Sequence, residues 1–244
     1  EIHWRDWSSD VCSSDLDHKS RLFSPVLGVK PDHLIRIIGN SFLLQSLHIA
    51  LMPFDPLTVI CLEKSYNVTS AGIQEMLCNK ITATCIIHKD MGLVADVFSE
   101  RTLQRLTGHL ATGHVRYSTT GSSIPANVQP LQADSIDGPM ALAHNGNLVN
   151  TLNLRRRLLL KGSTFSTSMD TEVIIKLLAR SRRPTEEEKF KELMDEIHGA
   201  YAIVACTNKA LYGCRDPFGY RPLVLGKTEK GWVLASETPA LDAI

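Results

Sequence analysis

Residues 185–214 read TEEEKFKELMDEIHGAYAIVACTNKALYGC, and this stretch predicts a helix followed directly by a pair of strands. Thr185 and Glu188 have the spacing of a capping box, in which each side chain bonds to the backbone N–H of the other residue at a helix start. Apolar residues then recur at i, i+3, i+4 and i+7, the spacing of one helical face. They are Phe190, Leu193, Met194 and Ile197.

The second half of the stretch has the sequence pattern of strands instead of a helix. Gly199 is expected to end the helix, because glycine adopts the backbone conformation that helix ends often require. Two short apolar runs follow, at residues 200–206 and 210–214, and Asn208-Lys209 between them supplies a turn.

Further elements are predicted on both sides of this stretch. Strands are expected at Gly113–Thr119, Met140–His144, Pro222–Leu225 and Trp232–Ser236, and helices at Asn147–Leu160 and Asp170–Ser181. Helices grouped before a run of hairpin strands favour an α+β fold, with helices covering an antiparallel sheet.

Composition narrows the classes of function. The chain has 244 residues, 43% of them hydrophobic, with 26 basic and 26 acidic side chains. This balance gives no reason to expect a nucleic-acid or membrane partner. The most apolar stretch, residues 41–52, is shorter than the roughly 20 residues that cross a bilayer. Six scattered cysteines predict reduced thiols in a cytoplasmic protein.

The sequence pattern of the N-terminal third differs from that of the rest of the chain. Residues 6–16 resemble a sequencing-adapter oligonucleotide read as protein, so residues 1–16 are interpreted as an artefact. Residues 17–87 contain clumps of apolar residues without helical or strand periodicity. They are interpreted as an unmatched or aberrant segment, either buried strand or intron or out-of-frame sequence. Residues 88–244 are locally consistent throughout and are expected to form the folded domain.

Four clusters of polar residues and glycines lie at the ends of predicted elements, where functional sites usually occur. They are residues 113–121 (GHVRYSTTG), 143–150 (AHNGNLVN), 168–172 (SMDTE) and 215–223 (RDPFGYRPL), the last followed by Ala235-Ser236-Glu237-Thr238.

Each cluster also has a structural explanation when taken alone. Asn145-Gly146 is a common turn dipeptide, and Asp170 could be a helix N-cap. His114 and His144 are expected to be buried, hydrogen-bonded structural histidines, because no metal-ligand spacing accompanies them.

Taken in order, the clusters resemble the class II, N-terminal-nucleophile glutamine amidotransferases. Their pattern is G-H-x-R-Y/W-S/A-T, then H-N-G, then a helix opening with D-T/S-E. The RDPFGYRPL run and the Gln129-Pro130 pair are similar to the amidophosphoribosyltransferase branch. This resemblance implies an αββα sandwich whose N-terminal strands are missing or replaced in this sequence.

The resemblance also implies a glutamine site. Arg116 would hold the α-carboxylate of glutamine through two parallel hydrogen bonds, and Asp170 would accept from the α-ammonium group. Tyr117 and Thr119 would line the same pocket. Asn145 and Gly146 would form the oxyanion hole, with the side-chain amide and the backbone N–H as the two donors. Gly146 would in addition allow close backbone approach.

The nucleophile implied by the resemblance is not found. The family uses an N-terminal cysteine in a C-G-I/V-F/L-G context, with its own α-amino group as the base. Cys61, Cys78 and Cys85 are followed by Leu62, Asn79 and Ile86, and none fits that pattern. The chain as written is therefore expected to be inactive.

Partners and cofactors follow from the same resemblance. The substrate would be glutamine, and phosphoribosyl pyrophosphate would bind to a second domain, absent from this sequence, that also takes Mg²⁺. Some members carry an iron–sulfur cluster, but no cofactor or metal is expected in this part. The full-length enzyme is expected to be a homo-oligomer. Two alternatives remain: another class II amidotransferase, such as the glucosamine-6-phosphate-forming transaminase, or a non-catalytic glutamine-binding module.

Overall fold

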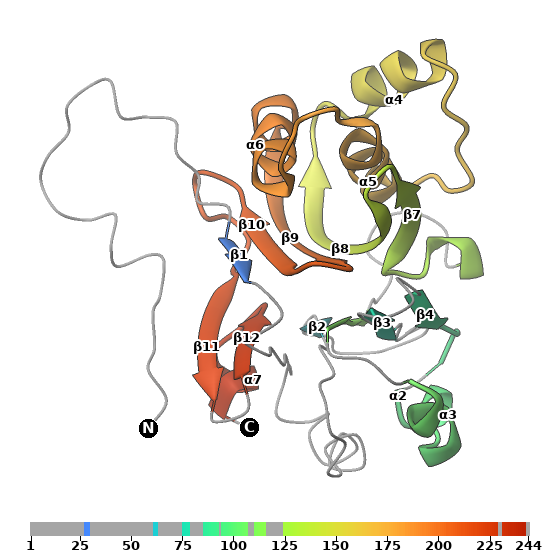
Figure 1. Ribbon diagram of the computed structural model, residues 1–244, viewed down its shortest axis with the longest axis vertical. Helices are drawn as coiled ribbons and strands as arrows, with labels where there is room; N and C mark the ends of the chain where they lie inside the picture. Colours follow the sequence, from blue (N-terminus) through green and yellow to red (C-terminus); the bar gives the residue numbers. More distant parts are fainter. Residues whose placement is uncertain are drawn as a thin grey trace, which may run out of the picture.

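A computed structural model of the chain describes residues 27–29, 61–62, 75–78, 85–92, 94–106, 110–115, 124–228 and 231–242. These residues form four layers in the order helices, sheet, smaller sheets, helices (Figure 1). The α+β class and the αββα order of layers predicted from the sequence are both present.

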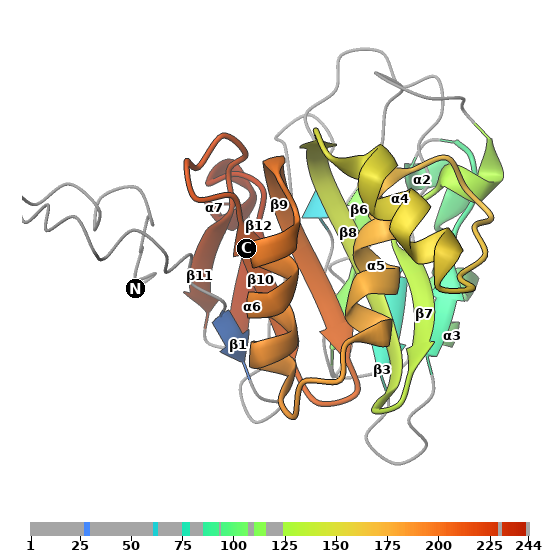
Figure 2. The same cartoon turned by 90° about the horizontal axis from the view of Figure 1, so that it is seen from above.

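The largest sheet has five strands, and every pair in it is antiparallel (Figure 2). In order across the sheet they are β1 (Leu27–Val29), β10 (Leu211–Arg215), β9 (Gly199–Thr207), β8 (Gly138–Leu148) and β7 (Leu131–Ser135). The central pair, β8 with β9, keeps one register from Met140 opposite Thr207 to Leu148 opposite Gly199. This long pair is the frame on which the polar clusters are placed.

Three helices cover one face of this sheet: α4 (Thr151–Leu160), α5 (Asp170–Arg180) and α6 (Glu186–Glu196). Because strand side chains alternate between faces, Leu142 and Ile203 point to the helices and join Ile174 and Phe190 in one core. The predicted capping box of Thr185 and Glu188 is present at the start of α6.

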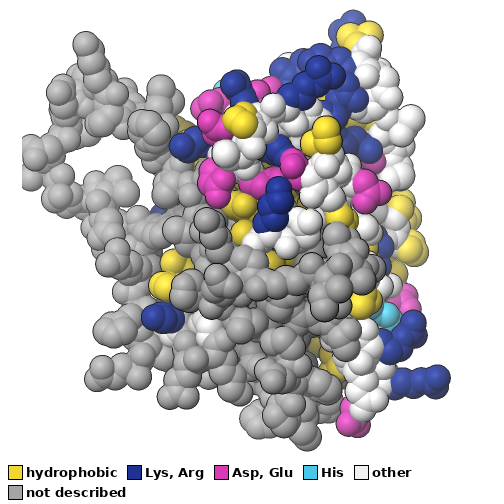
Figure 3. Space-filling model, viewed as in Figure 1, with side chains coloured by type: hydrophobic (Ala, Val, Ile, Leu, Met, Phe, Trp, Pro, Cys, Tyr) yellow, Lys and Arg dark blue, Asp and Glu magenta, His cyan; other side chains and the backbone are white. Residues whose placement is uncertain are grey.

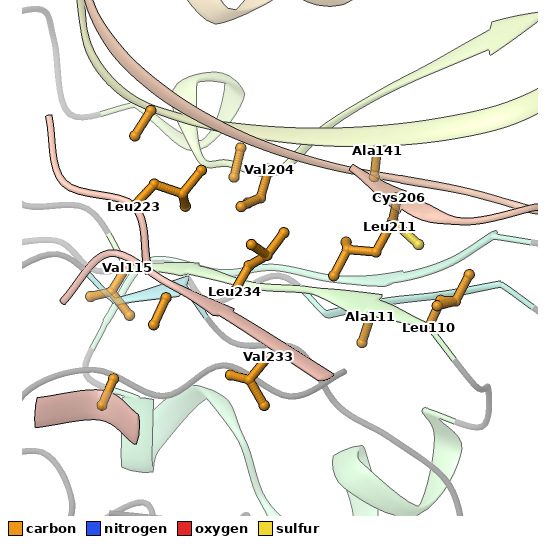
Figure 4. Close-up of a cluster of buried hydrophobic side chains, with 14 of the residues drawn as sticks. Leu110, Ala111, Val115, Ala141, Val204, Cys206, Leu211, Leu223, Val233 and Leu234 are labelled. Carbon is orange, nitrogen blue, oxygen red and sulfur yellow. The ribbon is translucent and has the colours of Figure 1, made fainter. Parts of the chain in front are cut away.

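The opposite face of the sheet packs on three smaller sheets. These are β2 (Cys61–Leu62) with β6 (His114–Val115), β3 (Glu75–Cys78) with β4 (Cys85–His88) and β5 (Ala111–Thr112), and β11 (Val224–Thr228) with β12 (Gly231–Ala235). Between the layers, Ala141 and Val204 of the large sheet face Val115 and Leu234 (Figure 4). Both faces of β8 and β9 are therefore buried.

Short helices complete the outer layer: α2 (Val94–Val97), α3 (Glu100–Arg105) and α7 (Pro239–Asp242), with a 3₁₀ turn, η1, at Pro125–Asn127. Within the described ranges no helix is long and apolar enough to cross a membrane.

Basic side chains gather over α4 (Figure 3), where Arg156 and Arg157 are exposed beside Leu159 and Leu160.

Strands β1, β2 and β3 lie in the segment 17–87, which is interpreted above as unmatched or aberrant, and β4 crosses the end of that segment. Strand β1 pairs with β10, β2 pairs with β6, and β3 pairs with both β4 and β5. The segment thus contributes backbone pairing to three sheets, and the proposed boundaries at residues 16 and 87 stay predictions.

The helix predicted at Asn147–Leu160 begins later than expected. Asn147 and Leu148 belong to β8, where they pair with Ala200 and Gly199, and the helix starts at Thr151. Leu148 is buried, as an apolar residue on the inner face of the predicted helix would also be, but its burial comes from the strand. A single apolar residue fits a strand end and a helix face equally well, so periodicity placed it in the wrong element.

The predicted role of Gly199 was also wrong. The helix α6 ends at Glu196, and Gly199 is the first residue of β9 with φ +138°. A Cβ built there would meet the Asn147 carbonyl oxygen and lie 2.9 Å from the Leu148 Cα. The glycine is needed for the close approach of β9 to β8.

We expect Gly199→Ala to destabilise the protein by about 2–6 kcal/mol, because strain at a positive φ and overpacking each cost about 1–3 kcal/mol. The matched control is Gly162→Ala, since Gly162 also has a positive φ, +82°, but no atom lies within 4 Å of an added Cβ. Urea unfolding of both variants measures the difference. Equal losses of stability would show that the approach of the two strands is not constrained at Gly199.

Candidate functional site

The Asn145-Gly146 pair lies near the end of β8, opposite Ala202 and Tyr201 of β9. Gly146 has φ +135°, and a Cβ added to it would meet the Ala200 carbonyl oxygen and lie 2.9 Å from the Ala200 carbonyl carbon. A glycine is therefore needed at position 146 because the backbone of β9 lies so close to it. Asn145-Gly146 is not a hairpin turn, because both residues lie within the strand.

The side chain of Asn145 points away from the helices, into the layer between the sheets. It is 7% exposed, and its Oδ1 lies 2.8 Å from Nε2 of His114, which is 1% exposed. His114 belongs to β6, in one of the smaller sheets, so this contact links two layers of the fold. His114 is buried and hydrogen-bonded, as the sequence predicted.

His144, the residue before Asn145, projects to the helix side of the same strand. Its Nδ1 lies 3.5 Å from Oδ1 of Asp170 and 3.5 Å from Oγ1 of Thr171, both in the first turn of α5. The third sequence cluster is thereby held against the second. This histidine is also buried, as predicted.

Asp170 is fixed at the end of β8 by several contacts. Its Oδ2 accepts from the Leu148 N–H at 3.1 Å, and its Oδ1 accepts from the Thr171 N–H at 2.9 Å. Burial alone would raise the pKa of this carboxyl. The hydrogen bond and charge of His144 and the two N–H donors outweigh burial, so the pKa lies below its ordinary value of 3.8. Asp170 is thus held as a carboxylate, and 14% of its side chain is exposed.

Asp170 does not act as the N-cap of α5. The N-cap position is Met169, and Asp170 is the first helical residue. A carboxylate has about four acceptor sites, so these contacts leave Asp170 capacity for a further donor.

Gln129 supports His144 in a way that the sequence analysis did not foresee. Its side-chain amide pairs with both backbone groups of His144: Oε1 accepts from the N–H at 2.8 Å, and Nε2 donates to the carbonyl at 3.2 Å. The strand β7 begins only at Leu131. The Gln129 side chain therefore continues the ladder along β8 where the backbone of β7 has ended.

The fourth cluster is organised by Asp216, which is 2% exposed. Its carboxylate accepts from four backbone N–H groups, those of Tyr201, Phe218, Tyr220 and Arg221, at 3.0–3.3 Å. The Asp216 N–H in turn donates to the Tyr201 carbonyl. Because Tyr201 is the register partner of Gly146, this loop is joined to the strand end that carries Asn145.

Glu172, the last residue of the SMDTE cluster, has a structural task. Its carboxylate accepts from the N–H groups and hydroxyls of Ser166 and Thr167. Burial would raise the pKa of Glu172, but these bonds and the charge of Lys176 hold it below its ordinary range. The loop that leads into α5 is thereby fixed, and with it the position of Asp170.

Three predicted site residues, Arg116, Tyr117 and Thr119, lie outside the described residues. Asn145, Gly146 and Asp170 lie at one end of β8, although strand alternation turns Asn145 and His144 to opposite faces of the sheet. Sequence reasoning missed the bonds made by Gln129, Glu172 and Asp216. The available signal was the place of Glu172 and Asp216 within the quoted clusters and of Gln129 in the quoted Gln129-Pro130 pair.

The cysteines of the large sheet do not supply a nucleophile. Cys206 and Cys214 are both fully buried. Burial raises the pKa of the Cys214 thiol to about 12, so almost none of it is the reactive thiolate at neutral pH. Cys85, in β4, is partly exposed. Among the described residues, no group of three or more His, Cys, Asp or Glu side chains could hold a metal ion.

Comparison with protein families matches residues 114–243 to a glutamine amidotransferase domain. Two curated relatives show the same likeness. Amidophosphoribosyltransferase from Synechococcus elongatus is 47% identical over 167 residues, covering 65% of this chain and 34% of that protein. Amidophosphoribosyltransferase 2, chloroplastic, from Arabidopsis thaliana is 46% identical over 175 residues, covering 71% and 31%. The chain thus spans about a third of the length of these relatives.

Two solved structures resemble the fold. One, described as the allosteric regulatory enzyme of purine biosynthesis, has a TM-score of 0.67 and 39% identity, covering 71% of this chain and 37% of that one. The other is glutamine phosphoribosylpyrophosphate amidotransferase from B. subtilis in complex with ADP and GMP, with a TM-score of 0.67 and 32% identity, covering 89% and 43%. These neighbours agree with the predicted N-terminal-nucleophile hydrolase sandwich.

The lowered pKa of Asp170 predicts a pH-dependent contribution to stability. Its folded-state pKa lies below the ordinary value of 3.8, so the contribution is present above that value and is lost as the pH falls through the folded pKa. Asp170→Asn should lower the free energy of unfolding by about 1.5–3 kcal/mol at pH 6, since its bonds are to a charged group. The difference from the unmodified chain should shrink below pH 3.8 in urea unfolding. Asp134→Asn, at an exposed position in β7, should show little difference at either pH, and a constant effect of Asp170→Asn would contradict the assignment.

Proposed function

The chain belongs to the glutamine amidotransferase domain family, and from this we propose that its folded region binds glutamine and orients the side-chain amide. Hydrolysis of that amide would in addition need the cysteine nucleophile of the family. In the longer protein, the released ammonia would pass to C1 of phosphoribosyl pyrophosphate, giving phosphoribosylamine and pyrophosphate. This acceptor is supported by the relatives, which are amidophosphoribosyltransferases.

One observation carries the proposal: the Asp170 carboxylate is bonded to the end of β8, the same strand end that carries the Asn145 side-chain amide. Asp170 bonds to the backbone of Leu148, only three residues after Asn145. A glutamine whose α-ammonium group bonds to Asp170 would direct its side chain along this strand end. Holding the substrate in one orientation supplies the positional part of catalysis.

Asn145 and Gly146 would act on the reacting amide. When a thiolate adds to a carboxamide, the carbonyl oxygen becomes negative and requires donors that are already oriented. The Asn145 side-chain amide and the Gly146 N–H are assigned this role. Arg116 would hold the α-carboxylate of glutamine, and Tyr117 and Thr119 would line its pocket.

A second candidate, a glutamine-binding module without catalysis, is favoured by one observation. None of the six cysteines stands in the C-G-I/V-F/L-G context of the family nucleophile. Such a chain would retain a glutamine pocket but could form no acyl-enzyme intermediate, because the remaining geometry cannot replace a nucleophile. The two candidates share the binding step and differ in turnover.

Binding is tested by titration calorimetry with L-glutamine. We expect saturable binding, and Asp170→Asn should weaken it about 10- to 100-fold, since a charge-assisted bond contributes about 1.5–3 kcal/mol. Circular dichroism confirms that the variant remains folded at the titration temperature. Asp134→Asn makes the same chemical change at an exposed position and should bind as the unmodified chain does. Equal affinities for all three proteins would remove Asp170 from the site.

Turnover is tested by ammonia release from glutamine. We expect none above the rate without protein, because the chain has no cysteine in the family context. A positive control with added free ammonia checks the assay. Release that persists through purification and disappears after treatment with a thiol-directed glutamine analogue would overturn the expectation. It would also exclude the non-catalytic candidate.

A further inference from the structure

The contact between His114 and Asn145 joins two buried polar side chains from different sheets. The distance from Nε2 to Oδ1 is 2.8 Å, within the range of a well-formed hydrogen bond. His114 lies on β6 and Asn145 on β8, and both are almost completely buried. Two strands that are not hydrogen-bonded to each other are thus connected through their side chains.

The direction of this bond fixes the orientation of an amide. A neutral imidazole has one N–H donor and one acceptor nitrogen, and an asparagine amide has an acceptor end and a donor end. With Oδ1 of Asn145 facing Nε2, the proton must be on Nε2, and the amide nitrogen Nδ2 must point away from His114. The opposite tautomer would reverse the amide and turn Oδ1 outwards.

This choice matters for the chemistry assigned to Asn145. An oxyanion is stabilised by N–H donors and repelled by a carbonyl oxygen, so only one of the two orientations suits an oxyanion hole. An asparagine free to flip would spend part of its time in the unsuitable orientation. A bond to a buried ring removes that freedom before the substrate arrives.

We propose that His114 is a positioning residue that holds the Asn145 amide with Nδ2 directed towards the bound glutamine. This inference rests on the proposed function, because Asn145 has this task only if glutamine binds at the end of β8. His114 itself does not touch the substrate; it acts through Asn145. Its effect should therefore fall mainly on the stabilisation of the developing oxyanion and little on the affinity for ground-state glutamine.

The tautomer of His114 is the direct test and requires no turnover. Nitrogen-15 NMR of the full chain distinguishes a protonated Nε2 from an unprotonated one, and the His114 signal is identified by its loss in His114→Gln. We expect Nε2 to carry the proton and Nδ1 to be unprotonated, at a pH where the ring is neutral. A protonated Nδ1 with an unprotonated Nε2 would overturn the proposal, because Asn145 would then donate to the ring and present its oxygen to the site.

Two variants separate positioning from filling of the core. His114→Gln places an amide nitrogen the same number of bonds from Cβ as the imidazole Nε2 and can still donate to Asn145. His114→Phe retains a ring but has no donor. On addition of glutamine, the Asn145 side-chain amide signal should shift in the unmodified chain and in His114→Gln, and the shift should be lost in His114→Phe. Glutamine affinity should stay within about threefold across the three proteins.

An equal shift in both variants would show that the ring only fills space, and the proposal would fail. If His114→Phe does not fold, the tautomer and the rescue by His114→Gln still decide the matter. The outcomes for the proposed function are separate. If glutamine does not bind to the unmodified chain, the proposed function fails, although the tautomer still reports which end of Asn145 faces His114.

Discussion

The close pairing of β8 with β9 is the constraint on which the rest of the structure depends. Near the strand end, each strand contributes a glycine with a positive φ, Gly146 and Gly199, and an added Cβ on either would enter the backbone of the other strand. The two backbones are thus closer than any other residue allows at these positions. This short region contains Asn145. It also contains the Leu148 N–H that bonds to Asp170 and the Tyr201 N–H that bonds to Asp216.

Both sheet faces are buried, so polar groups at this strand end are favoured when they are bonded within the protein. An unpaired polar group in a packed interior costs about 1–3 kcal/mol, and several groups near the strand end bond to a partner from another element. Asn145 bonds to β6, His144 approaches α5, and the His144 backbone bonds to Gln129. Through these contacts the clusters at residues 143–150 and 168–172 are bonded to the sheet, and Asp216 bonds the cluster at residues 215–223 to it.

Sequence reasoning succeeded where a local pattern was sufficient. The capping box at Thr185 and the apolar face of α6 are read from residues a few positions apart, and both are present. It failed at Leu148 and Gly199, where the deciding contact is with a strand some 50 residues away. The bond from Gln129 to His144 crosses 15 positions and uses a side chain in place of a strand, and no periodicity signals such a bond. Arg116, Tyr117 and Thr119 stay predictions.

Most contacts that hold the candidate site also hold the fold. Asp170 joins α5 to β8, His114 joins two sheets, and Asp216 closes the loop after β10. A chain that lost its nucleophile would still need these bonds for stability, since breaking any of them would leave buried groups unpaired. The motifs would therefore persist after turnover had ceased. Their presence agrees with the glutamine amidotransferase domain family, whereas the proposed turnover would depend on a thiol that these contacts neither require nor supply.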